Sequence, residues 1–215
     1  MAFSQFGSIA AVQAAYRIRH VLTHDVFGTT AMEPSPQFVA DLRWQQMHID
    51  TSSEAARREL LIGPLLREVY RSYADRLALW VEHDLSADAP LSGTPDYMIS
   101  ALSPLGVMVF TTPVLIVIEA KRDDFVFGWG QCLATLVAAQ QYNRDTQLEV
   151  FGIVTNGRSW EFGRLREEIF TQVDNPVSLA DIGVLFAAVD YLFTRADELL
   201  SEHTPMPQSG NLSAS

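Results

Sequence analysis

The 215-residue sequence has little of several residue types that build common sites. Its single cysteine, Cys132, excludes an internal disulfide and a cysteine-rich zinc site. Its five histidines are scattered, without the spacing of a zinc site. No apolar stretch approaches the about 20 residues that a membrane helix needs, and the N-terminus lacks the basic start of a secretory signal. We therefore expect a cytoplasmic protein in a reducing compartment, without membrane contact.

Positive charge is also scarce, since 15 basic residues face 26 acidic ones and the net charge is −11. This balance argues against a protein that coats nucleic acid non-specifically. Eight acidic and two basic residues lie within 166–215, a net of −6, which leaves −5 for residues 1–165. The acidity therefore counts against a nucleic-acid substrate without excluding one.

Lysine is the scarcest basic residue, because Lys121 is the only one and the other 14 basic residues are arginines. An ammonium is compact and can release its proton, whereas a guanidinium cannot. Lys121 is therefore a candidate for a chemical role, with retention by chance as the alternative.

Hydrophobic residues make up 48% of the chain, enough for the core of one domain. We expect residues 1–50 to be an N-terminal extension, with a helix over 9–21 and a loop around Pro34 and Pro36. Residues 51–200 are expected to form the main domain, and 201–215 a disordered tail.

The pattern of apolar residues within 51–200 predicts the order of elements. A helix capped at Thr51–Ser53 and broken by Pro64 comes first. The elements that follow are strands at 77–81, 97–100 and 114–118, a helix over 124–142, strands at 150–154 and 159–162 joined at Asn156-Gly157, and a helix over 179–200. The 114–118 run does not alternate, which predicts a central strand buried on both faces. This order predicts an α/β fold in which helices flank a mixed sheet.

Charged residues follow two of these strands. Glu119 and Lys121 share one face at the end of a buried run, where they could simply neutralise each other. Asp96 opens the preceding strand, so strand pairing would bring Asp96, Glu119 and the Ala120 carbonyl together. Three such oxygens suit Mg²⁺. Lys121 would then lie beside a metal-bound water, which it could help deprotonate, or beside a phosphate whose developing charge it could stabilise.

These residues resemble those of a known family. Gly93-Thr94-Pro95-Asp96-Tyr97 followed by Val117-Ile118-Glu119-Ala120-Lys121 resembles the PD-(D/E)xK nuclease superfamily. Ser53–Arg57 with Leu61-Ile62-x-Pro64-Leu65-Leu66 is similar to the first helix of the nuclease domain in type I restriction motor subunits. Phe151–Gly157 with Trp160 is similar to the strand and turn after the core helix there. The resemblance covers roughly residues 51–170 and implies a restriction-endonuclease-like αβββαβ core.

The resemblance also implies an activity and a set of site residues. It implies a Mg²⁺-dependent nuclease, with Mn²⁺ as a substitute, that hydrolyses DNA phosphodiester bonds in restriction or repair. Asp96, Glu119 and the Ala120 carbonyl would bind the metal, and Lys121 would be catalytic. Glu54 would support the metal or its water from the first helix, with Glu59 as the alternative. Gln131 matches a glutamine near the active site, or is an ordinary polar helix residue.

Other interpretations stay open. DNA is the expected partner, and a homodimer or a restriction-system partner is compatible with the sequence. A nuclease-like fold without activity, serving as a binding or regulatory module, is favoured by the acidity. Metal-dependent chemistry on a small phosphorylated substrate is a third reading. Glu82-His83-Asp84 could ligate a metal or form a solvated strand end. The remaining candidates for phosphate contacts, each with an equal claim as a solvated or paired side chain, are Arg57, Arg58, Arg122 and Arg158.

Overall fold

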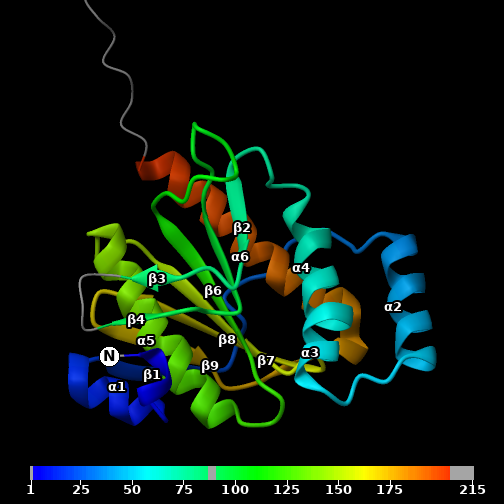
Figure 1. Ribbon diagram of the computed structural model, residues 1–215, viewed down its shortest axis with the longest axis horizontal. Coiled ribbons are helices and arrows are strands. Elements are labelled where there is room, and N and C mark those ends of the chain that lie inside the picture. The colour runs from blue at the N-terminus through cyan, green and yellow to red at the C-terminus, as the bar shows by residue number, and fades with distance from the viewer. Residues whose placement is uncertain (1, 87–90, 204–215) are drawn as a thin grey trace, which may run out of the picture.

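A mixed sheet of eight strands forms the centre of the computed structural model, which describes residues 2–86 and 91–203 (Figure 1). Its strands lie in the order β1 (Arg19–Thr23), β9 (Ile169–Val173), β8 (Ser159–Arg166), β7 (Val150–Thr155), β6 (Val114–Ala120), β5 (Tyr97–Ala101) and β2 (Leu77–Val81), and β10 (Val177–Ser178) pairs with β8. The β1–β9 and β6–β7 pairs are parallel and the others antiparallel. A separate hairpin consists of β3 (Leu85–Ser86) and β4 (Ser92–Gly93). The expected α/β fold with a mixed sheet is therefore confirmed.

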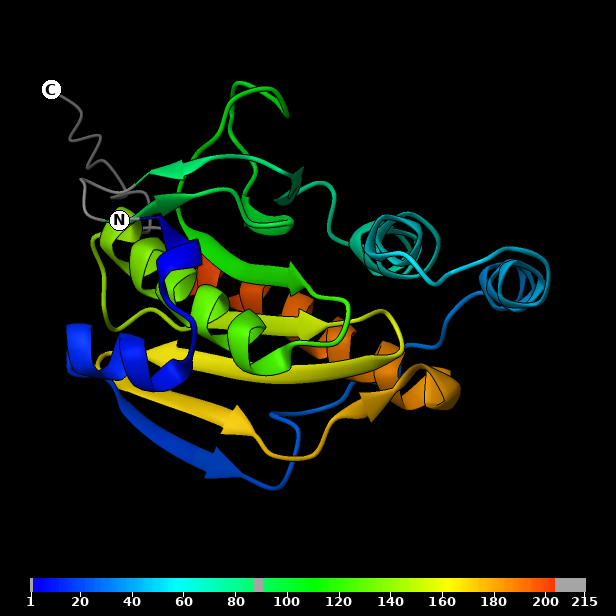
Figure 2. The ribbon, with the colours of Figure 1, turned by 60° about the horizontal axis from the view of Figure 1, so that its bottom comes forward.

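Helices cover both faces of this sheet (Figure 2). One face packs against α5 (Phe125–Asn143), with α1 (Ile9–Tyr16) beside it. The other face packs against α4 (Gly63–Tyr70) and α6 (Ile182–His203), and α2 (Pro36–His48) lies outside α4. Short helical segments complete the set, namely η1 (Phe3–Gln5), α3 (Glu54–Arg57), η2 (Arg58–Ile62) and η3 (Leu179–Asp181). Among residues 2–86 and 91–203, no helix has the length and hydropathy to cross a membrane.

Strand β6 is buried along its whole length, between β5 and β7. Its run of apolar residues without alternation predicted this position, because both faces are covered by helices. The predicted strands at 77–81, 97–100, 150–154 and 159–162 and the helix over 124–142 are also present, with small differences at their ends.

The first helix of the main domain is interrupted, as Pro64 predicted. Ser53 Oγ accepts a hydrogen bond from the Ala56 N–H at 3.1 Å and so caps α3. The chain then forms the π-helical turn η2 before α4, which begins at Gly63 and carries Pro64 in its first turn. Proline cannot donate the backbone hydrogen bond that a continuous α-helix requires, so the wider turn absorbs the break.

Two expectations for the first 50 residues are wrong. The expected helix over 9–21 ends at Tyr16, because Arg17 adopts a left-handed conformation with φ of 58°, and Arg19–Thr23 forms β1. The expected loop around Pro34 and Pro36 is present at Pro34 but ends at Ser35, because Ser35 caps α2 and Pro36 fits its first turn. This part of the chain thus contributes the edge strand β1 to the main sheet.

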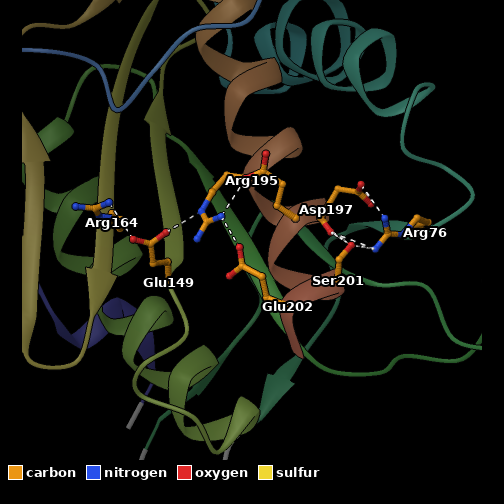
Figure 3. A network of polar contacts seen from close by, with 8 residues as sticks. Arg76, Glu149, Arg164, Arg195, Asp197, Ser201 and Glu202 are labelled. Carbon is orange, nitrogen blue, oxygen red and sulfur yellow. Dashed lines mark hydrogen bonds and ion pairs between the residues drawn. The ribbon is translucent and has the colours of Figure 1, made fainter. Parts of the chain in front are cut away.

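The C-terminal helix is tied to the sheet by a chain of charged side chains (Figure 3). Glu149, buried just before β7, accepts from Arg164 of β8 at 2.9 Å and from Arg195 of α6 at 3.3 Å. Arg195 also pairs with Glu202 at 3.0 Å. The helix was expected over 179–200 and begins instead as η3 before α6. Of the expected tail, residues 201–203 belong to α6, and 204–215 lie outside the described residues.

Candidate functional site

A cleft of about 170 Å³ lies where β5 begins, β6 ends and α5 runs past them. Its walls consist of Ala2, Phe3, Ser4, Gly93, Thr94, Asp96, Glu119, Lys121 and Gln131. Four of the residues singled out in the sequence, Asp96, Glu119, Lys121 and Gln131, therefore border the same space. Ala2, Phe3 and Ser4 were not anticipated, because they lie far from the motif in the sequence.

The register of β5 and β6 explains why Asp96 and Glu119 meet. Tyr97 pairs with Ile118 in the antiparallel ladder, so Asp96 stands opposite Glu119. Directly opposed residues of two strands point to the same face of a sheet. Asp96 Oδ2 also accepts a hydrogen bond from the Ala120 N–H at 2.7 Å, which fixes its carboxylate at the end of β6.

Glu119 is a buried carboxylate with one cationic neighbour. Lys121 Nζ donates to Glu119 Oε2 at 3.4 Å, and the Lys121 side chain remains 19% exposed. The pKa of Glu119 is raised to about 7, mainly by burial. The negative charges of Asp96 and Glu54 raise this pKa further, and the positive charge of Lys121 lowers it. The Lys121 ammonium therefore only partly offsets the burial of this carboxylate.

Asp96 forms an ion pair with Arg58, which the sequence analysis did not predict. Arg58 Nη1 lies 3.1 Å from Asp96 Oδ1, and the same guanidinium pairs with Glu82. Burial raises the pKa of Asp96, against the Ala120 N–H, Lys121 and Arg58, which favour the ionised form. Arg58 stands on the π-helical turn η2, and such turns occur frequently at functional sites.

Glu54 begins α3 and is not one of the residues that line the cleft. Its charge nevertheless raises the pKa of both Asp96 and Glu119. Glu59, the alternative, is exposed on η2, and its charge acts on the Tyr97 hydroxyl, whose pKa burial raises. Glu54 is thus a charged neighbour of the two carboxylates from outside the cleft.

Gln131 provides an unusual polar atom in the cleft wall. Within the described part of the chain, its Oε1 is one of the few buried side-chain atoms without a hydrogen-bond partner. Buried acceptors are nearly always satisfied, so an unpaired one indicates a place for a bound donor such as a water molecule. This distinguishes Gln131 from an ordinary polar residue on a solvated helix face.

The other charged candidates have partners of their own. Glu82 pairs with Arg58, and Asp84 accepts from the Thr94 hydroxyl. The His83 ring packs at a tilt against Trp80, with 4.6 Å between the ring centroids. The triplet Glu82–Asp84 therefore does not present its side chains to one ion. Arg57 bonds the Arg122 carbonyl at 2.7 Å and so holds the loop after β6 against the first helix.

The donor set is sparse for a metal but chemically suitable. Across residues 2–86 and 91–203, no group of three or more His, Cys, Asp or Glu side chains is arranged to hold an ion. Mg²⁺ usually takes only one or two protein carboxylates and completes its shell with waters and substrate phosphates. Two opposed carboxylates and the unpaired Gln131 Oε1 beside one cleft fit that requirement.

Comparison of the chain with models of known protein families found no match, and neither did comparison with curated proteins.

Proposed function

We propose that the protein is a Mg²⁺-dependent nuclease with a restriction-endonuclease-like fold, of the PD-(D/E)xK kind, that hydrolyses DNA phosphodiester bonds in restriction or repair. The observation that carries the proposal is the convergence of Asp96, Glu119, Lys121 and Gln131 on one cleft. These four residue types, with Asp96 directly opposite Glu119, provide ligands, a cation and a water-orienting acceptor for phosphodiester hydrolysis.

Asp96 and Glu119, with the Ala120 carbonyl, are the groups that would hold Mg²⁺. Glu54 would support the metal or its water through its charge. When bound, the metal supplies a Lewis acid and lowers the pKa of a coordinated water. A cation here also offsets the burial that raises the pKa of both Asp96 and Glu119, and the negative charge of Asp96 that adds to the rise at Glu119. Mn²⁺ prefers similar oxygen ligands and should substitute.

Lys121 and Gln131 are the groups proposed to act on the water and the phosphate. The Lys121 side chain is held by Glu119 yet reaches the cleft, where its ammonium can stabilise negative charge on the phosphate. Once it has released its own proton, its neutral amine can instead take a proton from the attacking water. The unpaired Gln131 Oε1 can accept a hydrogen bond from that water and orient it. Arginine at position 121 could not release a proton, which is consistent with the only lysine standing there.

A cleavage assay tests the proposal. Wild-type protein should cut plasmid, linear or single-stranded DNA with Mg²⁺ or Mn²⁺ and not with EDTA. Glu119→Gln keeps the shape of the side chain and removes the charge that binds the metal, so it is the matched inactive control. Cutting that persists in the Glu119→Gln preparation would indicate a contaminating nuclease. No cutting of any DNA or RNA by wild type would contradict the proposal.

The Arg58–Asp96 ion pair favours a second candidate, a nuclease-like module that binds without cleaving. The guanidinium occupies Asp96 Oδ1, one of the oxygens a metal would use, and the net charge of −11 repels nucleic acid. Calorimetric titration with Mg²⁺ and Mn²⁺ distinguishes the candidates. Binding that Glu119→Gln abolishes supports the nuclease, whereas no binding of either metal supports the module.

A further inference from the structure

The outer wall of the cleft is formed by the segment Ala2–Ser4, which lies outside the residues that resemble the nuclease family. Phe3 and Ser4 belong to the short helix η1, and the chain continues past α5 into α1. The segment thus lines the same cleft as Asp96 and Glu119, so a group bound at these carboxylates lies beside it.

This wall, residues Ala2–Ser4, is packed against the rest of the protein. Phe3 is only 4% exposed and rests on Gly93, where an added Cβ would lie 2.3 Å from its ring. Ala2 forms a parallel β-bridge with Ser92. Further along, a Cβ at Gly130 of α5 would lie 2.3 Å from the Phe6 carbonyl oxygen and 2.4 Å from the Ser8 nitrogen. Gly93 therefore makes room for the Phe3 ring, and Gly130 allows the backbone at Phe6 and Ser8, just after the segment, to approach α5 this closely.

The cleft behind this wall is small and offers little free positive charge. Its volume of about 170 Å³ is below the roughly 300–1,000 Å³ of pockets that enclose a drug-sized ligand. The wall itself contributes no charged side chain, since Ala2–Ser4 are neutral. Of the cations beside the carboxylates, Lys121 is paired with Glu119, and Arg58 with Asp96 and Glu82. Such a site has room for a phosphate and part of one nucleotide.

We propose that the Ala2–Ser4 wall selects a single nucleic-acid strand, either unpaired or at a frayed end, over an intact duplex. This inference rests on the proposed nuclease function. A duplex carries one charge per about 1.7 Å of its axis and is usually held by a broad basic surface, whereas this chain has a net charge of −11. A single strand has a lower charge density, and its unstacked bases can turn away from the wall while one phosphate enters.

Two substitutions loosen the wall without touching the carboxylates. Gly130→Ala pushes the backbone at Phe6 and Ser8 away from α5, and Phe3→Ala removes the ring that packs on Gly93. Gly183→Ala is the matched control, because a Cβ at this position near the start of α6 meets nothing within 4 Å. Melting temperatures establish that each variant is folded.

The experiment compares one labelled oligonucleotide alone and annealed to its complement, at matched Mg²⁺. Wild type should cleave the single strand about tenfold faster or more, because the duplex must first be opened. Phe3→Ala and Gly130→Ala should reduce this ratio severalfold, and Gly183→Ala should preserve it. Fluorescence anisotropy with Ca²⁺ in place of Mg²⁺ should show the same preference in binding.

Three results would overturn the inference. If wild type cleaves the duplex as fast as the single strand, the inference is wrong, but the proposed nuclease function still holds. An unchanged ratio in both folded wall variants would show that the segment does not select the strand. Wild type that cleaves neither substrate would contradict the proposed function, and the inference would fall with it.

Discussion

Arg58 Nη1 lies 3.1 Å from Asp96 Oδ1, while the Ala120 N–H donates to Asp96 Oδ2 at 2.7 Å. One carboxylate oxygen is thus bound by a guanidinium from the first helix and the other by the backbone of β6. The arrangement fixes the Asp96 side chain in its rotamer and places a positive charge next to the candidate metal site. It therefore joins the first helix to the cleft by charge as well as by packing.

Arg58→Gln should strengthen metal binding. Removing the guanidinium takes away a positive charge that competes with the cation for Asp96, so Mg²⁺ and Mn²⁺ should bind about threefold to tenfold more tightly. Isothermal titration calorimetry measures this directly. Arg122→Gln is the control, because Arg122 is 66% exposed and pairs with Asp123. Weaker metal binding in Arg58→Gln would mean that the ion pair is needed to shape the site.

The stability of the metal-free protein should fall as pH rises from about 4.5 to 7. The pKa of Glu119 is raised from its ordinary 4.5 to about 7, chiefly by burial, so the folded state holds a proton that the unfolded state has released in this window. Linkage then makes the free energy of unfolding decrease with pH, by an amount on the order of a few kcal/mol for Glu119 alone.

Urea denaturation at several pH values, in EDTA, tests this linkage. Glu119→Gln should remove most of the decrease, because its amide does not titrate. Added Mg²⁺ should stabilise wild type more at pH 7.5 than at pH 5. If the free energy of unfolding falls with pH as steeply in Glu119→Gln as in wild type, the pH dependence comes from other groups.

Asp96→Asn should separate metal binding from folding. Asparagine keeps an oxygen that can accept the Ala120 N–H, so the metal-free melting temperature should change by only about 2–4 °C. The rise in melting temperature that Mg²⁺ gives wild type should disappear. A thermal melt with and without Mg²⁺ provides both numbers. A large loss of stability without metal would instead identify Asp96 as a structural partner of Arg58.

Phe170→Ala should destabilise the whole domain by about 3–5 kcal/mol. Phe170 of β9 is fully buried, lies 5.3 Å from the Trp129 ring of α5, and stacks at 5.4 Å on His20 of β1. Losing the ring therefore loosens the edge of the sheet to which the N-terminal residues belong. Urea denaturation measures the change. Val126→Ala, at a side chain that is 68% exposed, should have almost no effect.

The elements predicted correctly are those whose signal is local. The buried run that forms β6, the caps at Ser53 and the Asn156-Gly157 turn each act within a few residues, and Gly157 does adopt a positive φ of 81°. Strand β1 was missed because its partner β9 lies about 150 residues further along the chain. Helix α2 was missed because only Phe38 and Leu42 on it are buried, so its apolar pattern is weak.

The candidate site was likewise predictable from the sequence only where the signal is local. The spacing of Asp96, Glu119 and Lys121 on adjacent strands predicted that they converge, because strand alternation determines which side chains share a face. The pairing of Arg58 with Asp96 depends on the π-helical turn η2, and the Ala2–Ser4 wall depends on packing against Gly93. Neither leaves a periodic pattern in the sequence.

The rate of DNA cleavage by Lys121 variants is the most direct test of the proposed mechanism. Lys121→Arg keeps the charge that neutralises Glu119, and Lys121→Met keeps much of the aliphatic stem without charge. If the ammonium acts on the attacking water or the phosphate, both variants should lose about 10²–10⁴-fold in cleavage rate at matched Mg²⁺. Their melting temperatures should stay close to that of wild type, since the side chain is partly exposed. Near-wild-type cleavage by Lys121→Arg would contradict the account, because Lys121 would then serve only as the counter-ion of Glu119.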